Sequence, residues 1–281
     1  MVTTPPAHTD TRVEKVMHQL QPRLVEAREV VDVTPGYRRI TFGGEELAGF
    51  TSLSAGDHIK FLVSLDPARP PMPPVRTDQG MRAPEAAPPQ TMRDFTPRRF
   101  DADRNELVID FVLHDSGPVS DWARRAEPGS KAVVLGPRGS KVVDVAAFDW
   151  LLMVGDETML PSIARQLETI PAGTKLVAFV EVDGAEAEQA SGTAGDVELH
   201  WVHRNGDPRG SGTALLDAMK AAALPEGEFF AWAGGEAGQM KAIRRYLLDE
   251  RGANRAWTSM TGHWKRGEAD HDHHAPLDSD A

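Results

Sequence analysis

The first half of the chain alternates hydrophobic and polar residues with a period of two, which is typical of strands that bury one face. Turn-forming residues separate these runs, for example Pro35-Gly36-Tyr37 and the stretch 101–105. We therefore predict short antiparallel strands that close into a small barrel. An amphipathic helix is expected at 117–127, before the last of these strands. The predicted strands are 23–34, 38–44, 57–65, 93–100, 106–114 and 131–136.

The pattern changes near Phe148. Apolar runs now alternate with segments of helical period, which indicates a parallel, doubly wound sheet. The fold class is thus a two-domain protein, an antiparallel β-barrel followed by an α/β domain with a doubly wound parallel sheet. The predicted strands are 149–155, 175–182, 197–204 and 228–235, and the predicted helices are 157–170, 213–224 and 236–252.

We place the domain boundary at about residue 147. A proline-rich run at 66–90 is interpreted as an insertion within the barrel domain, because the strand pattern resumes after it. The C-terminal tail is polar and aperiodic, so we expect it to be disordered. The resulting segments are an N-terminal tail 1–20, a barrel domain 21–147, an α/β domain 148–267 and a His/Asp-rich tail 268–281.

Composition narrows the class of protein. The 281 residues include no cysteine, which excludes disulfides, thiolate metal sites, iron–sulfur clusters and cysteine nucleophiles. The chain has no apolar run of about 20 residues and no hydrophobic leader, so we expect a cytoplasmic protein without membrane insertion. We also expect a monomer. Of the net charge of −11, a net −10 falls on 148–281. This argues against nucleic-acid binding but leaves a small anionic ligand open in the near-neutral half.

The stretch TMRDFTPRRFD combines groups that suit a flat, anionic ligand. The forked guanidinium of Arg93 suits a phosphate, and the ring of Phe95 suits a heteroaromatic face. Thr96 adds a hydroxyl that can hydrogen-bond to either. Considered alone, the stretch is better explained by a surface charge, Arg93, beside a core residue, Phe95. No role is assigned to the two arginines that follow, Arg98 and Arg99.

Three other turns are candidates for ligand binding. Gly117 and Ser120 begin a predicted helix, where free N–H groups favour an anion, although Ser116 or Ser120 could simply be a helix cap. The turns 153–161 and 231–240 follow parallel strands, where doubly wound sheets bind ligands. Neither has the GxGxxG pattern, and a purely structural role remains an alternative. In the turn 153–161, the acidic side chains of Asp156 and Glu157 would repel a phosphate.

Two groups of histidines were also considered. The pair in the predicted strand 197–204 shows no Ser-His-Asp order or HExxH spacing, so hydrolysis is not supported. The tail contains metal-ligand types, but a disordered tail lacks preorganised geometry, and we predict no metal site there. The tail residues in question are Asp270, His271, Asp272, His273 and His274.

Six segments in order resemble the siderophore-interacting protein family, the FAD-dependent ferric-siderophore reductases of the ferredoxin–NADP reductase superfamily. The resemblance covers about residues 20 to 267 and implies an FAD-binding barrel followed by an NAD(P)H-binding α/β domain. The segments are RDFTPR, HDSGPVSDWA, LGPRGS, GDETMLPSIARQLE, AWAGGEAGQMKAIRRYLLDERG and TGHWKRG.

The resemblance also implies the site residues. FAD would be held by Arg93, Phe95, Thr96, His114, Gly117, Pro118, Val119 and Ser120. The flavin–nicotinamide junction would contain Asp156, Glu157 and Thr158, and the pyridine-nucleotide region Gly234, Gly235 and Glu236. An anionic ferric siderophore would be bound by Lys60, Arg138 and Lys265. No side chain is assigned as a catalytic acid or base.

Two residues depart from the family pattern, since Phe95 and His263 stand where the family has tyrosines. The insertion 66–90 is expected to form a lid or partner surface beside the site. The function implied is electron transfer from NADH, NADPH or reduced ferredoxin through FAD to Fe(III) in a siderophore. The alternatives are a general NAD(P)H:flavin or ferredoxin oxidoreductase, and a non-catalytic siderophore-binding module.

Overall fold

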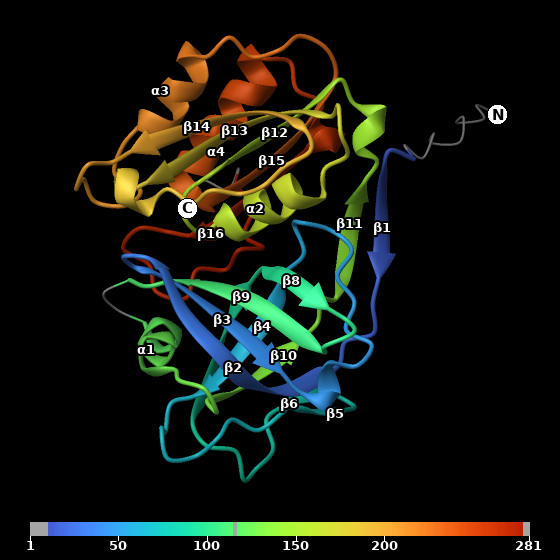
Figure 1. Cartoon of the computed structure of the whole chain (residues 1–281), viewed down its shortest axis with the longest axis vertical. Coiled ribbons are helices and arrows are strands. Elements are labelled where there is room, and N and C mark those ends of the chain that lie inside the picture. Colours follow the sequence, from blue (N-terminus) through green and yellow to red (C-terminus); the bar gives the residue numbers. More distant parts are fainter. Residues whose placement is uncertain (1–10, 115–116, 278–281) are drawn as a thin grey trace, which may run out of the picture.

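The computed structural model describes residues 11–114 and 117–277 and contains two main sheets, stacked along the long axis of the molecule (Figure 1). The barrel lies below and the parallel sheet above in this view, and the helix α2 (Leu160–Thr169) lies at their boundary. The two-domain architecture predicted from the sequence is confirmed. In the described part of the chain, no helix is long and apolar enough to cross a membrane.

The barrel is a seven-stranded antiparallel sheet in the order β7-β4-β10-β2-β3-β9-β8. Its two edge strands, β7 and β8, are separated in the chain by Thr96 alone. The sheet must therefore curl until its edges meet at that residue, where Pro97 interrupts the strand. The strands are β2 (Pro22–Thr34), β3 (Tyr37–Gly43), β4 (Ile59–Ser64), β7 (Gln90–Phe95), β8 (Pro97–Asp101), β9 (Glu106–Val112) and β10 (Lys131–Leu135), and the one α-helix described in this domain is α1 (Pro118–Arg125).

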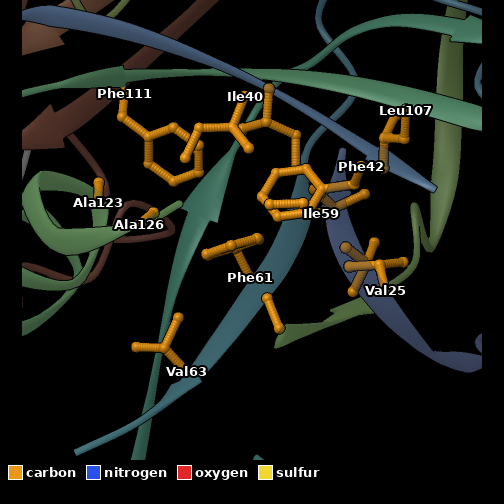
Figure 2. Close-up of a cluster of buried hydrophobic side chains, with 14 of the residues drawn as sticks. Val25, Ile40, Phe42, Ile59, Phe61, Val63, Leu107, Phe111, Ala123 and Ala126 are labelled. Atoms are coloured by element: carbon orange, nitrogen blue, oxygen red, sulfur yellow. The ribbon is translucent and has the colours of Figure 1, made fainter. Parts of the chain in front are cut away.

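Aromatic side chains fill the barrel (Figure 2). Phe61 of β4 packs against Phe42 of β3 and Phe111 of β9, with ring centroids 5.4 Å and 5.1 Å apart. Ile59 and Val63 point the same way as Phe61, because alternate residues of a strand share a face. Burial of each such side chain contributes about 1.5–3 kcal/mol. This core holds β4 and β7 rigidly, and those two strands carry several of the candidate site residues.

Two short pairs of strands lie outside the main sheets. β1 (Val13–Met17), which falls in the segment expected to be a tail, pairs with β11 (Gly139–Val143) as an arm beside both domains (Figure 1). The arm is anchored by Arg12, whose guanidinium lies 3.8 Å from the ring centroid of Trp257 and 3.0 Å from a carboxylate oxygen of Glu228.

The second pair, β5 (Val75–Thr77) and β6 (Gly80–Arg82), is a hairpin within the proline-rich insertion. It lies at the end of the barrel away from the α/β domain (Figure 1). The hairpin therefore forms no lid at the boundary between the domains, and the other expectation for the insertion, a partner surface, stays a prediction. The many prolines, which cannot donate to a sheet, keep this segment in a loop beyond the far end of β4 and β7.

The second sheet is fully parallel, in the order β14-β13-β12-β15-β16. Alternation along β12 sends Leu151 and Met153 toward α2 and Trp150 and Leu152 toward α3 and α4 on the opposite face. Both faces are thus covered by helices, which confirms the doubly wound prediction. The elements are β12 (Trp150–Gly155), β13 (Lys175–Val182), β14 (Asp196–His203), β15 (Phe229–Glu236), β16 (Thr258–Trp264), α3 (Ala214–Ala221) and α4 (Ala237–Arg245), which continues as a π-helical turn, Tyr246–Glu250.

The strand order places a topological switch point between β12 and β15. The chain moves outward from β12 through β13 to β14 and then returns to β15 on the other side. Gly155 and Gly234 are paired at the carboxyl ends of the two central strands. Ligands of open α/β sheets bind at such a point, so the fold itself selects this edge as the candidate site.

Candidate functional site

The barrel seam, which is the place where the edge strands β7 and β8 meet, contacts the second domain at Thr96. Its Oγ1 lies 3.4 Å from the Oγ of Ser162, in the first turn of α2. On the other side of the seam residue, the ring of Phe95 packs edge-on against Phe61 and tilted against Phe111, with centroids 5.6 Å and 4.7 Å away. Phe95 is only half-buried, so it presents part of its ring outside the core. An aromatic surface therefore lies directly at the junction of the domains.

Arg93, two residues before Phe95, points its guanidinium toward a carboxylate. Its Nη1 lies 3.0 Å from an oxygen of Asp270 in the C-terminal tail and donates to the Thr91 hydroxyl and the Met92 carbonyl. The Arg93 side chain is 34% exposed. An exposed cation that already attracts an anion of the same chain is well suited to an anionic ligand.

Lys60 lies directly opposite Asp94 in the β4–β7 register, and its Nζ donates to Asp94 at 2.6 Å. Leu135 of β10 pairs with Lys60 from the other side, and the exposed Arg138 follows three residues later. Lys265 follows β16 and forms an ion pair with Glu268 at 2.9 Å. The three cations predicted to bind substrate thus come from three separate segments, and each is at least partly exposed.

The beginning of α1 combines a bare helix end with a packed histidine. Gly117 is the N-cap, with no side-chain cap bond, and its φ of 143° favours glycine. A Cβ at Gly117 would lie 2.6 Å from Cε1 of His114. Ser120 does not cap the helix but bonds to the backbone N–H and carbonyl of His114, each at 3.0 Å. The other cap considered, Ser116, lies outside the described residues.

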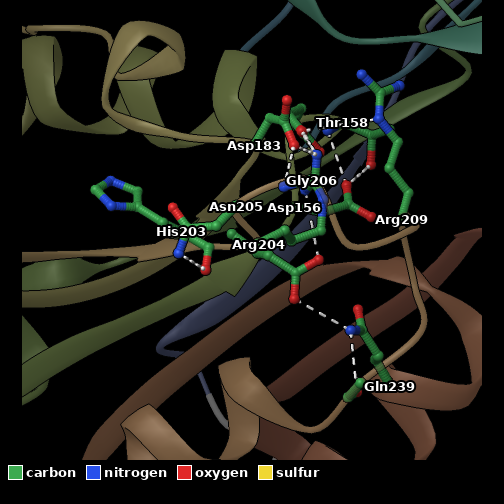
Figure 3. Close-up of polar contacts among 12 residues, drawn as sticks. Asp156, Thr158, Asp183, His203, Arg204, Asn205, Gly206, Arg209 and Gln239 are labelled. Carbon is green, nitrogen blue, oxygen red and sulfur yellow. Dashed lines mark hydrogen bonds and ion pairs between the residues drawn. The ribbon is translucent and has the colours of Figure 1, made fainter.

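The acidic turn after β12 is buried and internally satisfied. Asp156 accepts hydrogen bonds from the Thr158 amide at 2.8 Å and from Nε1 of Trp264 at 2.7 Å. Glu157 forms an ion pair with Arg204, and Arg209 lies 3.8 Å from the same oxygen (Figure 3). The carboxylates do not act as free negative charges at the strand ends. The expected repulsion of a ligand phosphate is correspondingly smaller.

A second network lies behind Arg204. Its Nη1 lies 3.5 Å from Glu181, which accepts a hydrogen bond from Gln239 at 3.2 Å (Figure 3). Burial raises the pKa of Glu181, despite the opposing effect of Arg204. The Glu236 carboxylate also has a partner, because it caps α4 by accepting a hydrogen bond from the backbone N–H of Gln239 at 2.9 Å. These contacts give Glu157 and Glu236 structural roles in addition to any ligand role.

His263 of β16 completes the strand-end cluster. Its Nδ1 lies 2.8 Å from Oγ1 of Thr158, which in turn donates to Asp156. A Cβ on Gly234 would lie 2.4 Å from the His263 ring, and one on Gly235 would lie 2.9 Å from Asp156. Both glycines are therefore required by close packing. Burial lowers the pKa of His263 to about 4, with smaller contributions from His273 and His58, so the imidazole is neutral at pH 7.

The sequence did not predict that Arg165 of α2 bonds to the barrel domain, a set of contacts that we call the interdomain clamp. Arg165 donates to the hydroxyl and carbonyl of Ser52, both at 2.7 Å, and to the Pro97 carbonyl at 2.9 Å. Arg98, which had no assigned role, is buried and forms an ion pair with Glu168. Hydrogen bonding to Arg98 lowers the pKa of Glu168, against a smaller effect of burial. Proximity to the Thr96 motif was the only signal available in the sequence.

A separate cavity of about 310 Å³ also lies between the domains. It is lined by Leu53, Val142 and Trp232 among other side chains, and by the edge of the clamp residue Arg165. None of the predicted site residues lines it. The Thr96 seam and the strand ends, rather than this cavity, remain the candidate site.

The fold and the site define a two-domain protein of the flavoprotein reductase class, with a barrel whose seam faces the switch point of a nucleotide-binding type of sheet. The comparisons with known proteins agree domain by domain. Residues 26–141 match the siderophore-interacting FAD-binding domain, and residues 148–267 match the siderophore-interacting protein family. The chain belongs to the siderophore-interacting protein family.

Three relatives illustrate the similarity. A siderophore utilization protein from T. fusca is 39% identical with a TM-score of 0.85, over 94% of this chain and 100% of that one. The NADPH-dependent ferric-chelate reductase of Escherichia coli is 33% identical, over 83% of this chain and 89% of its own length. The ferric vibriobactin reductase of Vibrio cholerae is 30% identical, over 92% and 94%.

Proposed function

We propose that the protein is an FAD-dependent ferric-siderophore reductase that acts in the cytoplasm and takes electrons from a pyridine nucleotide. The observation that carries the proposal is the meeting of Thr96, at the barrel seam, with α2 and the carboxyl ends of the parallel strands. This arrangement brings an aromatic and cationic strand of one domain beside the strand-end cluster of the other. The named activities of the two reductase relatives support it.

The residues at the seam fit a flavin dinucleotide. Arg93 offers a partly exposed cation and Phe95 part of an aromatic face. The α1 N-terminus offers backbone N–H groups that its N-cap residue, Gly117, has no side chain to bond. We assign these residues, with Thr96, to holding FAD. When bound, FAD supplies the conversion of two-electron hydride chemistry into single-electron transfer.

The donor side is assigned to the strand-end cluster. Asp156 and Glu157 are already bonded to Trp264 and Arg204, so they define the shape of this edge more than its charge. Because the Thr158 hydroxyl donates to Asp156, the neutral His263 donates to Thr158 through Nδ1 and leaves Nε2 as an acceptor without adding charge. We assign this edge of the sheet to the nicotinamide of NADH or NADPH. Reduced ferredoxin is the alternative electron donor.

The substrate side is assigned to Lys60, Arg138 and Lys265. Their cationic groups attract an anionic ferric complex to a protein that is otherwise acidic. One electron converts Fe(III) to Fe(II), and hard oxygen ligands hold Fe(II) far less tightly, so the iron is released. In this chemistry the protein binds and orients its ligands, and no side chain is required to transfer a proton.

The test is an anaerobic reduction series. The visible spectrum of the purified protein is recorded with FAD, then after NADH, NADPH or reduced ferredoxin, and finally after a ferric catecholate or hydroxamate complex. We expect bleaching of the flavin by a pyridine nucleotide and reoxidation by a ferric siderophore. A strong preference for free flavin as acceptor would instead indicate a general flavin reductase. Failure to bind FAD at all would indicate a non-catalytic siderophore-binding module.

A further inference from the structure

Three histidines from distant parts of the chain lie together beside β7. His58 precedes β4 in the barrel, whereas His273 and His274 belong to the C-terminal tail. Their potential ligand nitrogens all lie within 4.8 Å of one another. The ring centroids of His273 and His274 are 3.9 Å apart, and those of His58 and His273 are 4.9 Å apart. The tail, expected to be disordered, therefore has a defined place against the barrel in the described residues.

One of these histidines is oriented in the manner of a metal ligand. Nδ1 of His273 is bonded to Asp94 at 2.9 Å, which directs Nε2 away from the carboxylate. Within the described part of the chain, Nε2 is buried and has no hydrogen-bond partner. Histidines that bind metals generally donate their other ring nitrogen to a carboxylate, which fixes the tautomer and strengthens the ligand. The arrangement leaves Nε2 as the nitrogen available to an ion.

Contacts of Asp94 and of the tail keep His273 in this orientation. Asp94 is itself fixed by Lys60 at 2.6 Å, and the tail is attached one strand position away by the Arg93–Asp270 ion pair at 3.0 Å. The histidine cluster is thus anchored from the barrel and from the tail.

We propose that His58, His273 and His274 form a site for a divalent first-row transition metal, which fixes the tail across the strand that precedes Thr96. Three imidazoles and no thiolate suit Zn²⁺, Ni²⁺, Cu²⁺ or Fe²⁺ and leave a coordination position open. Tetrahedral ligands at about 2.0–2.1 Å from Zn²⁺ are about 3.3 Å apart. The nitrogens have to close by roughly 1–1.5 Å, which rotations of the His58 and His274 side chains can supply while Asp94 holds His273. The proposal does not depend on the proposed reductase function.

The experiment uses the untagged full chain freed of FAD, because FAD competes with the tail at Arg93, and Zn²⁺ is the probe. Equilibrium dialysis with elemental analysis gives the stoichiometry and affinity for the wild type and for H58A, H273A and H274A. We expect about one Zn²⁺ per chain, and a loss of at least tenfold in affinity for each variant. The matched control is H271A, because His271 lies in the same tail and contacts Glu268 rather than the cluster.

His58 is the decisive position, since it is the only ligand outside the tail. If H58A binds Zn²⁺ as tightly as the wild type, the tail alone chelates the ion and the proposal fails. It also fails if the wild type binds no Zn²⁺, or if H271A weakens binding as much as H273A. A second readout is hydrogen exchange at residues 270–277, which Zn²⁺ should slow in the wild type but not in H58A.

Discussion

The ion pair with Asp270 occupies the side chain of Arg93, the residue that we propose holds FAD. An exposed pair of this kind contributes about 0–1 kcal/mol, whereas charge-assisted hydrogen bonds to a phosphate are worth more. The tail carboxylate is therefore a weak competitor for a strong anion site. FAD binding and tail attachment are expected to oppose each other at Arg93.

The first prediction follows from this competition. R93A should lower FAD affinity by about ten- to a hundredfold, since it removes hydrogen bonds from a charged donor. D270N should raise FAD affinity by about two- to fivefold, because it removes only the competing charge. Fluorescence titration of the flavin-free protein measures both. The control is R99A, an exposed arginine on the adjacent strand. Unchanged FAD binding in R93A would show that the strand has been misassigned.

His263 shows how burial fixes a protonation state. Its pKa is lowered to about 4 in the folded protein, whereas a histidine of the unfolded chain titrates near 6.5. The unfolded state thus binds the proton first as the pH falls. The folded state loses stability from about pH 6.5 down to about pH 4, and is unaffected above this window.

The second prediction is that H263Q is less sensitive to acid than the wild type. Near pH 4, the buried His263 should lower the free energy of unfolding of the wild type by about 3 kcal/mol. The variant lacks this loss. Urea unfolding at pH 7.5 and at pH 5 measures the difference between the two proteins. Other groups with shifted pKa values, such as Asp94 and His58, titrate in both proteins and cancel to first order. An identical loss of stability in both proteins would contradict the assignment.

At the scale of elements, α2 connects the two domains. The strand at 93–100 could be predicted from the sequence, although Pro97 divides it into β7 and β8. The burial of Arg98 could not, since its partner Glu168 is 70 residues away and the pairing depends on how the domains meet. The same limit explains the tail. Its polar composition predicted disorder, while its contacts with Arg93 and Asp94 arise only in the folded chain.

The third prediction concerns the clamp. R165A should destabilise the protein by about 1–3 kcal/mol, because it leaves the part-buried carbonyls of Ser52 and Pro97 without their donor. It should also lower turnover, since Pro97 directly follows the seam residue Thr96. Q166A, one residue further along the helix, is the control. Thermal unfolding and steady-state reduction measure the two effects, and a fully stable R165A protein would show that the clamp contributes little.

At the scale of the molecule, charge is divided between the domains. The α/β domain and tail carry a net −10, whereas the barrel domain is nearly neutral and contributes Lys60 and Arg138. An anionic ligand is repelled by one half and attracted to cations at the edge of the other. Such a field speeds association of the correct ligand and is weakened by salt.

The last prediction uses this field to test the substrate assignment. A ferric tris-catecholate carries about three negative charges, while a ferric trihydroxamate core is neutral, so the two complexes separate charge from iron chemistry. The variant K60A/R138A/K265A should lower kcat/KM for the catecholate by about tenfold or more and leave the hydroxamate nearly unchanged. Raising the ionic strength from 0.01 M to 0.15 M, which shortens the Debye length from about 30 Å to about 8 Å, should reduce the wild-type preference for the catecholate. Arg28→Ala, which removes an exposed cation paired with Glu26, is the control. Equal losses for both complexes would mean that the three cations hold the fold or the flavin rather than the substrate.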